Sequence, residues 1–216
     1  MGLSVEEFYK GLTTDEYWPR MKTNQDAILE VFKTVQPPAE ATAFFDGLPQ
    51  PLRLAVFTED WCGDALTSTP SVLKLAGATK GLEVKVFERD KHREVTDSFL
   101  PEHRAGTLPV FVVFDQQMQE VARFIETAKE LQPLVGKMNE EIRSKRLAAA
   151  DADKGPREMT EEGRTVYRRE TVARRVAAAP EWGKVMIESF ARTVKEGLAR
   201  PAGERPAVGG TEWPPR

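Results

Sequence analysis

Residues 52–65, LRLAVFTEDWCGDA, decide the fold, because an apolar run passes through a short polar turn into a helical pattern. Residues 52–58 are mostly apolar and follow Pro51, which predicts a buried strand. Residues 64–78 have a helical pattern, and Pro70 inside it predicts a kink. Cys62 therefore lies at or just before the N-terminus of a helix that follows a buried strand.

The predicted position of Cys62 bears on the reactivity of its thiol. Unpaired backbone N–H groups and the positive end of the dipole at a helix N-terminus favour the thiolate, which is the reactive form of cysteine. Asp64 acts in the opposite direction, since a nearby carboxylate disfavours a second negative charge. A lone cysteine is also often a small buried hydrophobe, so a reactive role needs a second observation.

Three further strands and two further helical segments are predicted before residue 147. The strands cover residues 82–88, 110–114 and 121–125, while the helices lie within residues 91–103 and over residues 128–146. A strand, a helix and a strand in succession predict a parallel pair with a right-handed crossover, and the late hairpin adds an antiparallel strand. The fold class is therefore α/β, with a mixed central sheet and helices on both faces.

Helical extensions flank this central domain. The first extension covers residues 1–49. The capping-box pattern of Ser4 and Glu7 predicts a helix that ends near Gly11. A second helix should begin near Thr23 or Asn24, and a short third helix should cover residues 39–45. Residues 147–200 contain two more helices, 160–178 and 181–198. The apolar face of the second packs either on the main domain or on a second subunit, as in a homodimer through these helices. Residues 201–216 are rich in Pro and Gly, which predicts a flexible tail.

Composition and charge narrow the class of protein. The 216 residues are 40% hydrophobic and 30% charged with a net charge of −3, which is typical of a globular protein and gives no case for binding nucleic acid. Residues 151–216 hold 13 basic and 11 acidic side chains, so we interpret their arginines as a solvated helix face: Arg168, Arg169, Arg174 and Arg175. No segment approaches the ~20 apolar residues of a membrane span, and the acidic start lacks a secretory signal. The expected location is the cytoplasm, without membrane association.

The single cysteine and the two histidines limit the chemistry further. One cysteine excludes an intramolecular disulfide. The cysteine and histidines lack the spacing of a zinc site, so we expect no metal and no cofactor. His103 precedes Pro109 by six residues, which makes a Cys62–His103 pair a minor alternative.

Two stretches resemble the thioredoxin superfamily. Trp61-Cys62-Gly63-Asp64 is similar to the family's Trp-Cys-Gly-Pro-Cys, which lies at the same strand-to-helix junction. Gly106-Thr107-Leu108-Pro109-Val110 resembles the loop that carries the family's cis-proline. The resemblance covers residues 50–146 and implies a thioredoxin-like three-layer sandwich. More narrowly, the chain resembles a bacterial branch that carries Trp-Cys-Gly-Asp with one thiol.

The resemblance also implies the residues of the site. Cys62 is the nucleophile, and the cis bond between Leu108 and Pro109 is expected beside its sulfur. Substrate-binding roles fall on the residues around these two: Trp61, Gly63, Asp64, Thr107, Leu108 and Pro109. Trp61 either shapes the approach to the sulfur or is a core aromatic.

Three departures from the family change the expected chemistry. Ala65 replaces the resolving cysteine, which excludes a dithiol cycle. Val56 stands where thioredoxins carry a buried aspartate, and Asp64 replaces the proline. The expected function is a monothiol thiol–disulfide oxidoreductase, in which Cys62 forms a mixed disulfide that an external thiol resolves.

The expected partners are protein thiols and disulfides or a low-molecular-weight thiol. The alternative is a redox-silent module for protein binding or assembly, in which Trp61 and the Leu108–Pro109 edge hold an extended peptide.

Overall fold

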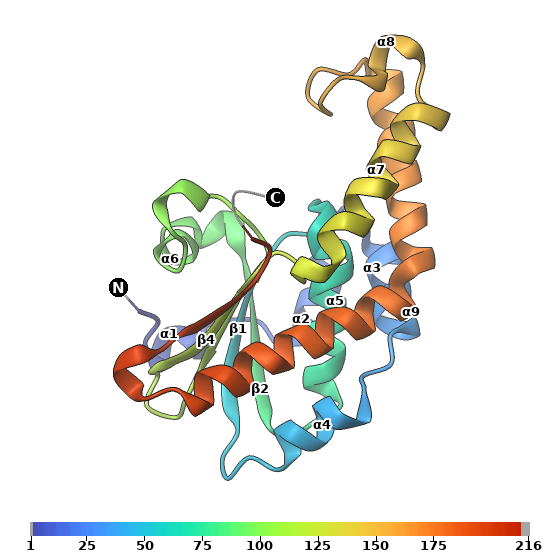
Figure 1. Ribbon diagram of the computed structural model, residues 1–216. Helices are drawn as coiled ribbons and strands as arrows, with labels where there is room; N and C mark the ends of the chain where they lie inside the picture. The colour runs from blue at the N-terminus through green and yellow to red at the C-terminus, as the bar shows by residue number, and fades with distance from the viewer. Residues whose placement is uncertain (1, 213–216) are drawn as a thin grey trace.

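A five-stranded mixed sheet forms the centre of the computed structural model, which describes residues 2–212 (Figure 1). Its order is β2-β1-β3-β4-β5. The strands are β1 (Leu52–Thr58), β2 (Leu82–Glu88), β3 (Val110–Phe114), β4 (Glu120–Ile125) and β5 (Ala207–Gly210). β1 is parallel to β2 and antiparallel to β3, and β4 is antiparallel to β3 and parallel to β5. The predicted parallel pair and hairpin are confirmed.

Helices cover both faces of the sheet, as the sequence predicts (Figure 1). One face carries α3 (Gln25–Thr34), α5 (Gly63–Gly77) and α9 (Glu161–Ala199), and the other carries α1 (Val5–Tyr9) and α6 (Arg93–Ser98). Successive side chains of a strand point to opposite faces, so β1 contributes to both cores. Leu54 and Val56 belong to the first core, whereas Ala55 and Phe57 belong to the second.

The N-terminal extension is joined to the sheet. Ser4 and Glu7 form both hydrogen bonds of the capping box of α1. The same pattern at Thr13 and Glu16 caps a helix that the sequence analysis missed, α2 (Thr14–Tyr17). Leu12 pairs with Val86 through two backbone hydrogen bonds of 2.8 Å each. The extension therefore covers part of the outer edge of β2, and α4 (Ala39–Asp46) leads back into β1.

The prediction of two helices in residues 160–198 is wrong. One helix, α9, runs from Glu161 to Ala199 with Pro180 inside it. Proline removes one helical hydrogen bond, and α9 changes direction between its two halves (Figure 1). The helix stays continuous, and side chains on both sides of the proline are buried: Arg175, Ala179, Trp182 and Met186. The apolar face of the C-terminal half lies in the core of this chain, which settles where that face packs.

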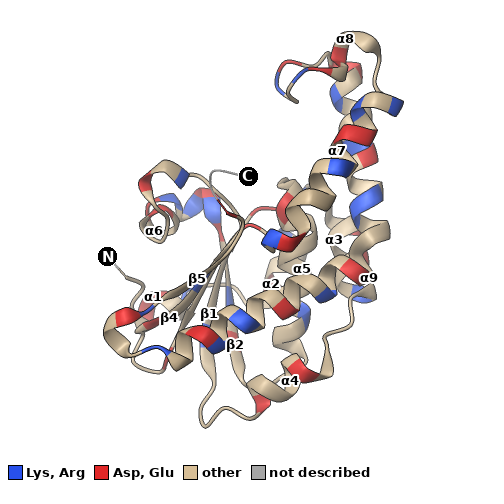
Figure 2. Cartoon of the chain, viewed as in Figure 1, with Lys and Arg blue, Asp and Glu red and all other residues tan. Residues whose placement is uncertain are grey.

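A helical arm projects from the sheet. α7 (Gln132–Arg146) and the first half of α9 lie side by side, and α8 (Ala149–Ala152) lies at the far end (Figure 1). Acidic and basic residues are interspersed along this arm (Figure 2). Arg146 pairs with Glu170 at 3.1 Å, and Arg174 pairs with Glu141 at 3.0 Å.

The prediction of a flexible tail over residues 201–216 is wrong for its central part. Residues Ala207–Gly210 form β5, which pairs with β4 along the edge of the sheet. The N–H and C=O groups along the outer side of β4 form hydrogen bonds with this segment, and amino-acid composition does not reveal such a pairing. Gly210 has a φ of +99°, and a Cβ there would lie 2.0 Å from the Ile125 carbonyl oxygen. Residues 213–216, with Trp213, lie outside the described range.

We expect Gly197→Ala to destabilise the protein by about 2 kcal/mol, because overpacking a close contact outweighs the better helix propensity of alanine. A Cβ at Gly197 of α9 would lie 2.1 Å from the Val121 carbonyl oxygen of β4. Gly136 of α7 is the matched control, since a Cβ there meets nothing within 4 Å. Urea unfolding should show Gly136→Ala as neutral or stabilising; equal effects of the two substitutions would contradict this packing.

Candidate functional site

Cys62 occupies the predicted position between β1 and α5. It is the N-cap residue of α5, with φ −80° and ψ 128°, and its carbonyl oxygen accepts the first helical hydrogen bond from Leu66 N at 3.1 Å. The residue is half-buried. The local sequence explains this, because the apolar run of β1 ends at the polar turn before Trp61 and helix-compatible residues follow Gly63.

The second stretch singled out in the sequence lies next to the thiol. The Leu108–Pro109 peptide bond is cis, as the resemblance implies. The Cys62 thiol donates a hydrogen bond to the Leu108 carbonyl oxygen, with an Sγ–O distance of 3.6 Å. On the far side, the Pro109 carbonyl oxygen accepts a hydrogen bond of 2.7 Å from Glu126 N. Residues 46 positions apart thus meet at one end of the sheet.

The surface around the sulfur is open on one side. Trp61 is 51% exposed, so the alternative of a core aromatic is wrong. Gly63 is exposed, and a Cβ there would meet nothing within 4 Å. Thr107 is half-buried, while Leu108 and Pro109 are buried. The thiol is therefore bounded by the cis-proline loop and flanked by an exposed indole.

Burial raises the pKa of the Cys62 thiol from 9.0 to about 11. The Asp64 carboxylate adds to this rise, because it disfavours a second negative charge close by. The backbone N–H groups of Ala65 and Asp64 lower the pKa without closing a regular capping hydrogen bond to the sulfur, and Arg175 lowers it as well. Of the two opposing effects in the sequence, the loss of hydration together with the carboxylate prevails over the helix terminus.

Arg175 was predicted on a solvated helix face, and this prediction is wrong. Its side chain is 5% exposed, and its Nη2 lies 2.8 Å from Asp64 Oδ1. The guanidinium also lies over the ring of Trp182, at 5.9 Å from the centroid. Nothing in the local sequence indicates this contact, because the partners are 111 residues apart.

Two of the residues that differ from the thioredoxin pattern add no reactive group next to the thiol. Val56 and Ala65 are 0% and 1% exposed, and Val56 belongs to the apolar core. Neither residue type provides a thiol or a carboxylate. His103 is exposed on a 3-10 turn, Glu102–Arg104, whereas the hydrogen bond of the Cys62 sulfur goes to Leu108. Within residues 2–212, no cluster of three or more His, Cys, Asp or Glu side chains is arranged to hold a metal ion.

The turn before Cys62 is held by the N-terminal extension, a role that the sequence analysis missed. The carboxylate of Asp60 accepts hydrogen bonds from the backbone N–H groups of Lys22 and Thr23, the second at 2.8 Å. Glu59 accepts a hydrogen bond of 2.7 Å from Asp90 N, which ties the turn to the end of β2. These contacts fix the backbone from which Trp61 and Cys62 project.

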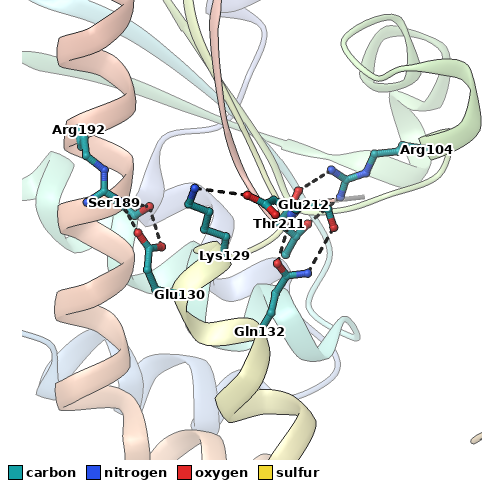
Figure 3. A network of polar contacts seen from close by, with 8 residues as sticks. All are labelled: Arg104, Lys129, Glu130, Gln132, Ser189, Arg192, Thr211 and Glu212. Carbon is teal, nitrogen blue, oxygen red and sulfur yellow. Dashed lines mark hydrogen bonds and ion pairs between the residues drawn. The ribbon is translucent and has the colours of Figure 1, made fainter. Parts of the chain in front are cut away.

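A cleft of about 810 Å³ lies close to Cys62, because Asp64, two residues further along the chain, forms part of its lining. It lies between the end of β4 and the start of α7, and its lining includes Asp64, Glu126, Gln132, Asn139 and Thr211. Figure 3 shows the polar network along it, in which Arg104 reaches Thr211, Gln132 contacts Glu212 and Lys129 pairs with Glu212.

The carboxylates of this cleft are paired. Glu126 accepts a hydrogen bond of 2.6 Å from Arg104, and Glu130 pairs with Arg192. Burial nevertheless raises the pKa of Glu126, with Asp64 adding to the rise and Arg104 opposing it.

A mixed sheet between helical layers, a cysteine at a helix N-terminus and an adjacent cis-proline define a thioredoxin-like protein. The chain belongs to the thioredoxin family, because the family model described as Thioredoxin matches residues 11–144, more than half of its length.

Two solved structures are similar to the chain, and the first of them supports the fold alone. A protein of unknown function from Pseudomonas aeruginosa is similar, with a TM-score of 0.54 and 14% identity over 91% of this chain and 99% of that chain. An HIV epitope-scaffold protein has a TM-score of 0.49 and 15% identity over 81% of this chain and 96% of that chain. No curated protein matches the chain. Among residues 2–212, no helix is long and apolar enough to cross a membrane.

Proposed function

We propose that the protein is a monothiol thiol–disulfide oxidoreductase that acts through Cys62. One observation carries the proposal: the sulfur lies 3.6 Å from the carbonyl oxygen of Leu108, beside a cis-proline and an exposed Trp61. This is the arrangement in which an incoming sulfur reaches Cys62 while its flanking backbone lies along the proline loop. The chain would then be a member of the bacterial branch with a Trp-Cys-Gly-Asp sequence, acting in a reducing compartment such as the cytoplasm.

The exchange needs two steps and one external thiol. The Cys62 thiolate attacks one sulfur of a disulfide R–S–S–R′, forms the Cys62–S–S–R bond and releases R′–S⁻, which takes up a proton. A second thiolate then attacks the mixed disulfide and releases the Cys62 thiolate. The external thiol supplies the electrons, since Ala65 leaves no internal group to do so.

The raised pKa shapes the rates of these steps. The thiolate of Cys62 is scarce at neutral pH, although each thiolate is more nucleophilic because nucleophilicity rises with pKa. A thiol of high pKa is also a poor leaving group, so the bond from Cys62 to its partner would be released slowly. In this proposal, the protein is a slow carrier that holds a sulfur compound in a mixed disulfide with Cys62, and it is not a fast disulfide reductase.

The proposed binding surface follows from exposure and position. Trp61 and Gly63 lie on the open side of the sulfur, and Thr107, Leu108 and Pro109 form the loop beside it. Asp64 borders the cleft of about 810 Å³, whose size is that of a small-molecule site. A low-molecular-weight resolving thiol has room there.

We expect Cys62 to form a mixed disulfide when the protein is incubated with oxidised glutathione at pH 8.5, and reduced glutathione to remove it. Intact-mass spectrometry over time measures both steps. Cys62→Ser is the control without a thiol, and the urea-unfolded chain is the control without a site. The raised thiol pKa alone would make both steps slower on the folded protein than on the urea-unfolded chain. If both steps are only as fast as the raised pKa predicts, the folded site does not assist exchange, and the proposal is contradicted.

A second candidate is a redox-silent module that binds an extended peptide. The high thiol pKa and the apolar Val56 and Ala65 favour it, because all three take away thiol chemistry and leave the Leu108–Pro109 edge intact. The two functions differ in one measurement. Peptides retained equally by the wild type and by Cys62→Ser would favour the module, whereas capture that needs the thiol would favour the oxidoreductase.

A further inference from the structure

The ion pair between Asp64 and Arg175 connects the site to a helix outside the matched family region. Arg175 belongs to α9, whereas the family match ends at residue 144. Its Nη2 lies 2.8 Å from Asp64 Oδ1, and Asp64 follows Cys62 by two residues on the first turn of α5. The Arg175 side chain is 5% exposed and that of Asp64 is 34% exposed. The pair is therefore shielded from solvent mainly on the arginine side.

The surroundings of Arg175 hold its charge in place. The guanidinium lies over the buried ring of Trp182, about two turns of α9 further along, at 5.9 Å from the centroid. The Nε atom is buried and has no hydrogen-bond partner among residues 2–212. A buried guanidinium needs a counter-charge, and Asp64 is the carboxylate that forms an ion pair with it.

Charged and titratable groups from several elements lie around this point. Cys62 and Asp64 come from the start of α5, and Arg175 comes from α9. Glu126, after β4, is close enough for Asp64 to raise its pKa, and Arg104 forms an ion pair with Glu126. Arg175 is therefore the cation next to Asp64, and Asp64 is the anion next to the thiol.

We propose that Arg175 is a positioning residue that sets the reactivity of Cys62 by neutralising and orienting Asp64. The inference rests on the proposed function only in that the thiolate is the reactive form of Cys62. Without the guanidinium, the Asp64 carboxylate would face the sulfur uncompensated and would disfavour the thiolate more strongly. The C-terminal helix would thereby act on the thiol from outside the family region.

The test is the rate of alkylation of Cys62 by iodoacetamide between pH 7 and pH 11. We expect Arg175→Met to slow the reaction at pH 8 by about threefold, because a rise of one pKa unit lowers the thiolate fraction about tenfold and the greater nucleophilicity of the thiolate returns about threefold. Arg175→Lys keeps the charge and should stay within about 1.5-fold of the wild type. Asp64→Asn removes the negative charge while its side-chain oxygen can still accept from Nη2, and should speed the reaction by about threefold.

The double variant separates an effect through Asp64 from a general structural effect. In the Asp64→Asn background, Arg175→Met should change the rate by less than about 1.5-fold, because the two substitutions couple. An undiminished effect in that background would overturn the proposal, and so would equal slowing by Arg175→Met and Arg175→Lys. If Arg175→Met does not fold by circular dichroism, Asp64→Asn alone decides: an unchanged or slower rate overturns the proposal.

The outcome is independent of turnover. Iodoacetamide reports thiolate formation whether or not the protein exchanges disulfides, so the glutathione experiment can fail while the alkylation series succeeds. Conversely, exchange that proceeds normally in Arg175→Met would overturn the inference and leave the proposed function intact.

Discussion

We expect Cys62 of the native protein to react with iodoacetamide about tenfold more slowly at pH 7 than Cys62 of the urea-unfolded chain. Burial raises the thiol pKa from 9.0 to about 11, which lowers the thiolate fraction at neutral pH by about a hundredfold. The nucleophilicity of a thiolate rises with the pKa of its thiol, with a Brønsted slope of about 0.5. This effect offsets about tenfold of the loss in rate, so that a decrease of about tenfold remains. The rate should rise tenfold for each pH unit and level off only near pH 11.

The pH profile is the sharper part of this experiment. The unfolded chain carries the same single thiol, so its rate should level off near pH 9 and serves as the internal control for reagent and buffer. A native profile that levels off below pH 8 would mean that the helix terminus outweighs both burial and Asp64. That result would also remove the reason for describing the protein as a slow carrier.

The sequence predicts the fold well because its elements are decided locally. The four strands between residues 52 and 125 are short runs of β-branched and aromatic residues that alternate between two buried faces, and the structure places all four within a residue of the prediction. The Cys62 junction and the cis-proline were also predicted, because each depends on a few adjacent residues and on the family resemblance.

The errors arise where distant segments decide the structure. The sequence of β5, Ala-Val-Gly-Gly, has weak strand propensity, and it forms a strand because β4 offers it an open edge. Pro180 suggests a break, yet buried contacts on both sides keep α9 continuous. The charge of Arg175 indicates solvent, but an aspartate 111 residues away and the ring of Trp182 bury it.

The same limit applies to Glu126, which no pattern in the sequence singled out. It has a φ of +65°, its N–H group binds Pro109, and its carboxylate accepts from Arg104 and Thr211. A residue in this region of backbone space persists only when its surroundings hold it there. The network around Glu126 is therefore what joins the cis-proline loop to the end of β5.

We expect Arg104→Met to reduce the free energy of unfolding by about 3 kcal/mol at pH 8, because it leaves a mostly buried carboxylate without its cationic partner. Arg104 is 8% exposed and donates to Glu126 at 2.6 Å. It also donates to Thr211 Oγ1 at 2.8 Å and to the Thr211 carbonyl oxygen at 3.0 Å (Figure 3). The raised pKa of Glu126 should rise further once the guanidinium is gone. A carboxyl whose folded pKa is raised contributes stability below its unfolded pKa and loses it as pH rises through the folded pKa.

The loss caused by Arg104→Met should therefore shrink by about 1 kcal/mol or more between pH 8 and pH 5, because Glu126 takes up a proton more readily without the guanidinium as the pH falls. Urea unfolding of both proteins at the two pH values measures this, and comparison at each pH cancels the titration of groups that the substitution does not affect. Adding Glu126→Gln should restore part of the stability at pH 8, since the amide leaves no buried charge. Arg93→Met is the matched control, because Arg93 is 65% exposed and its pair with Asp90 spans 3.8 Å, so its effect should stay within about 0.5 kcal/mol. A loss at Arg104 that is equally large at pH 5 would assign the destabilisation to the Thr211 contacts and β5 rather than to the unpaired carboxylate.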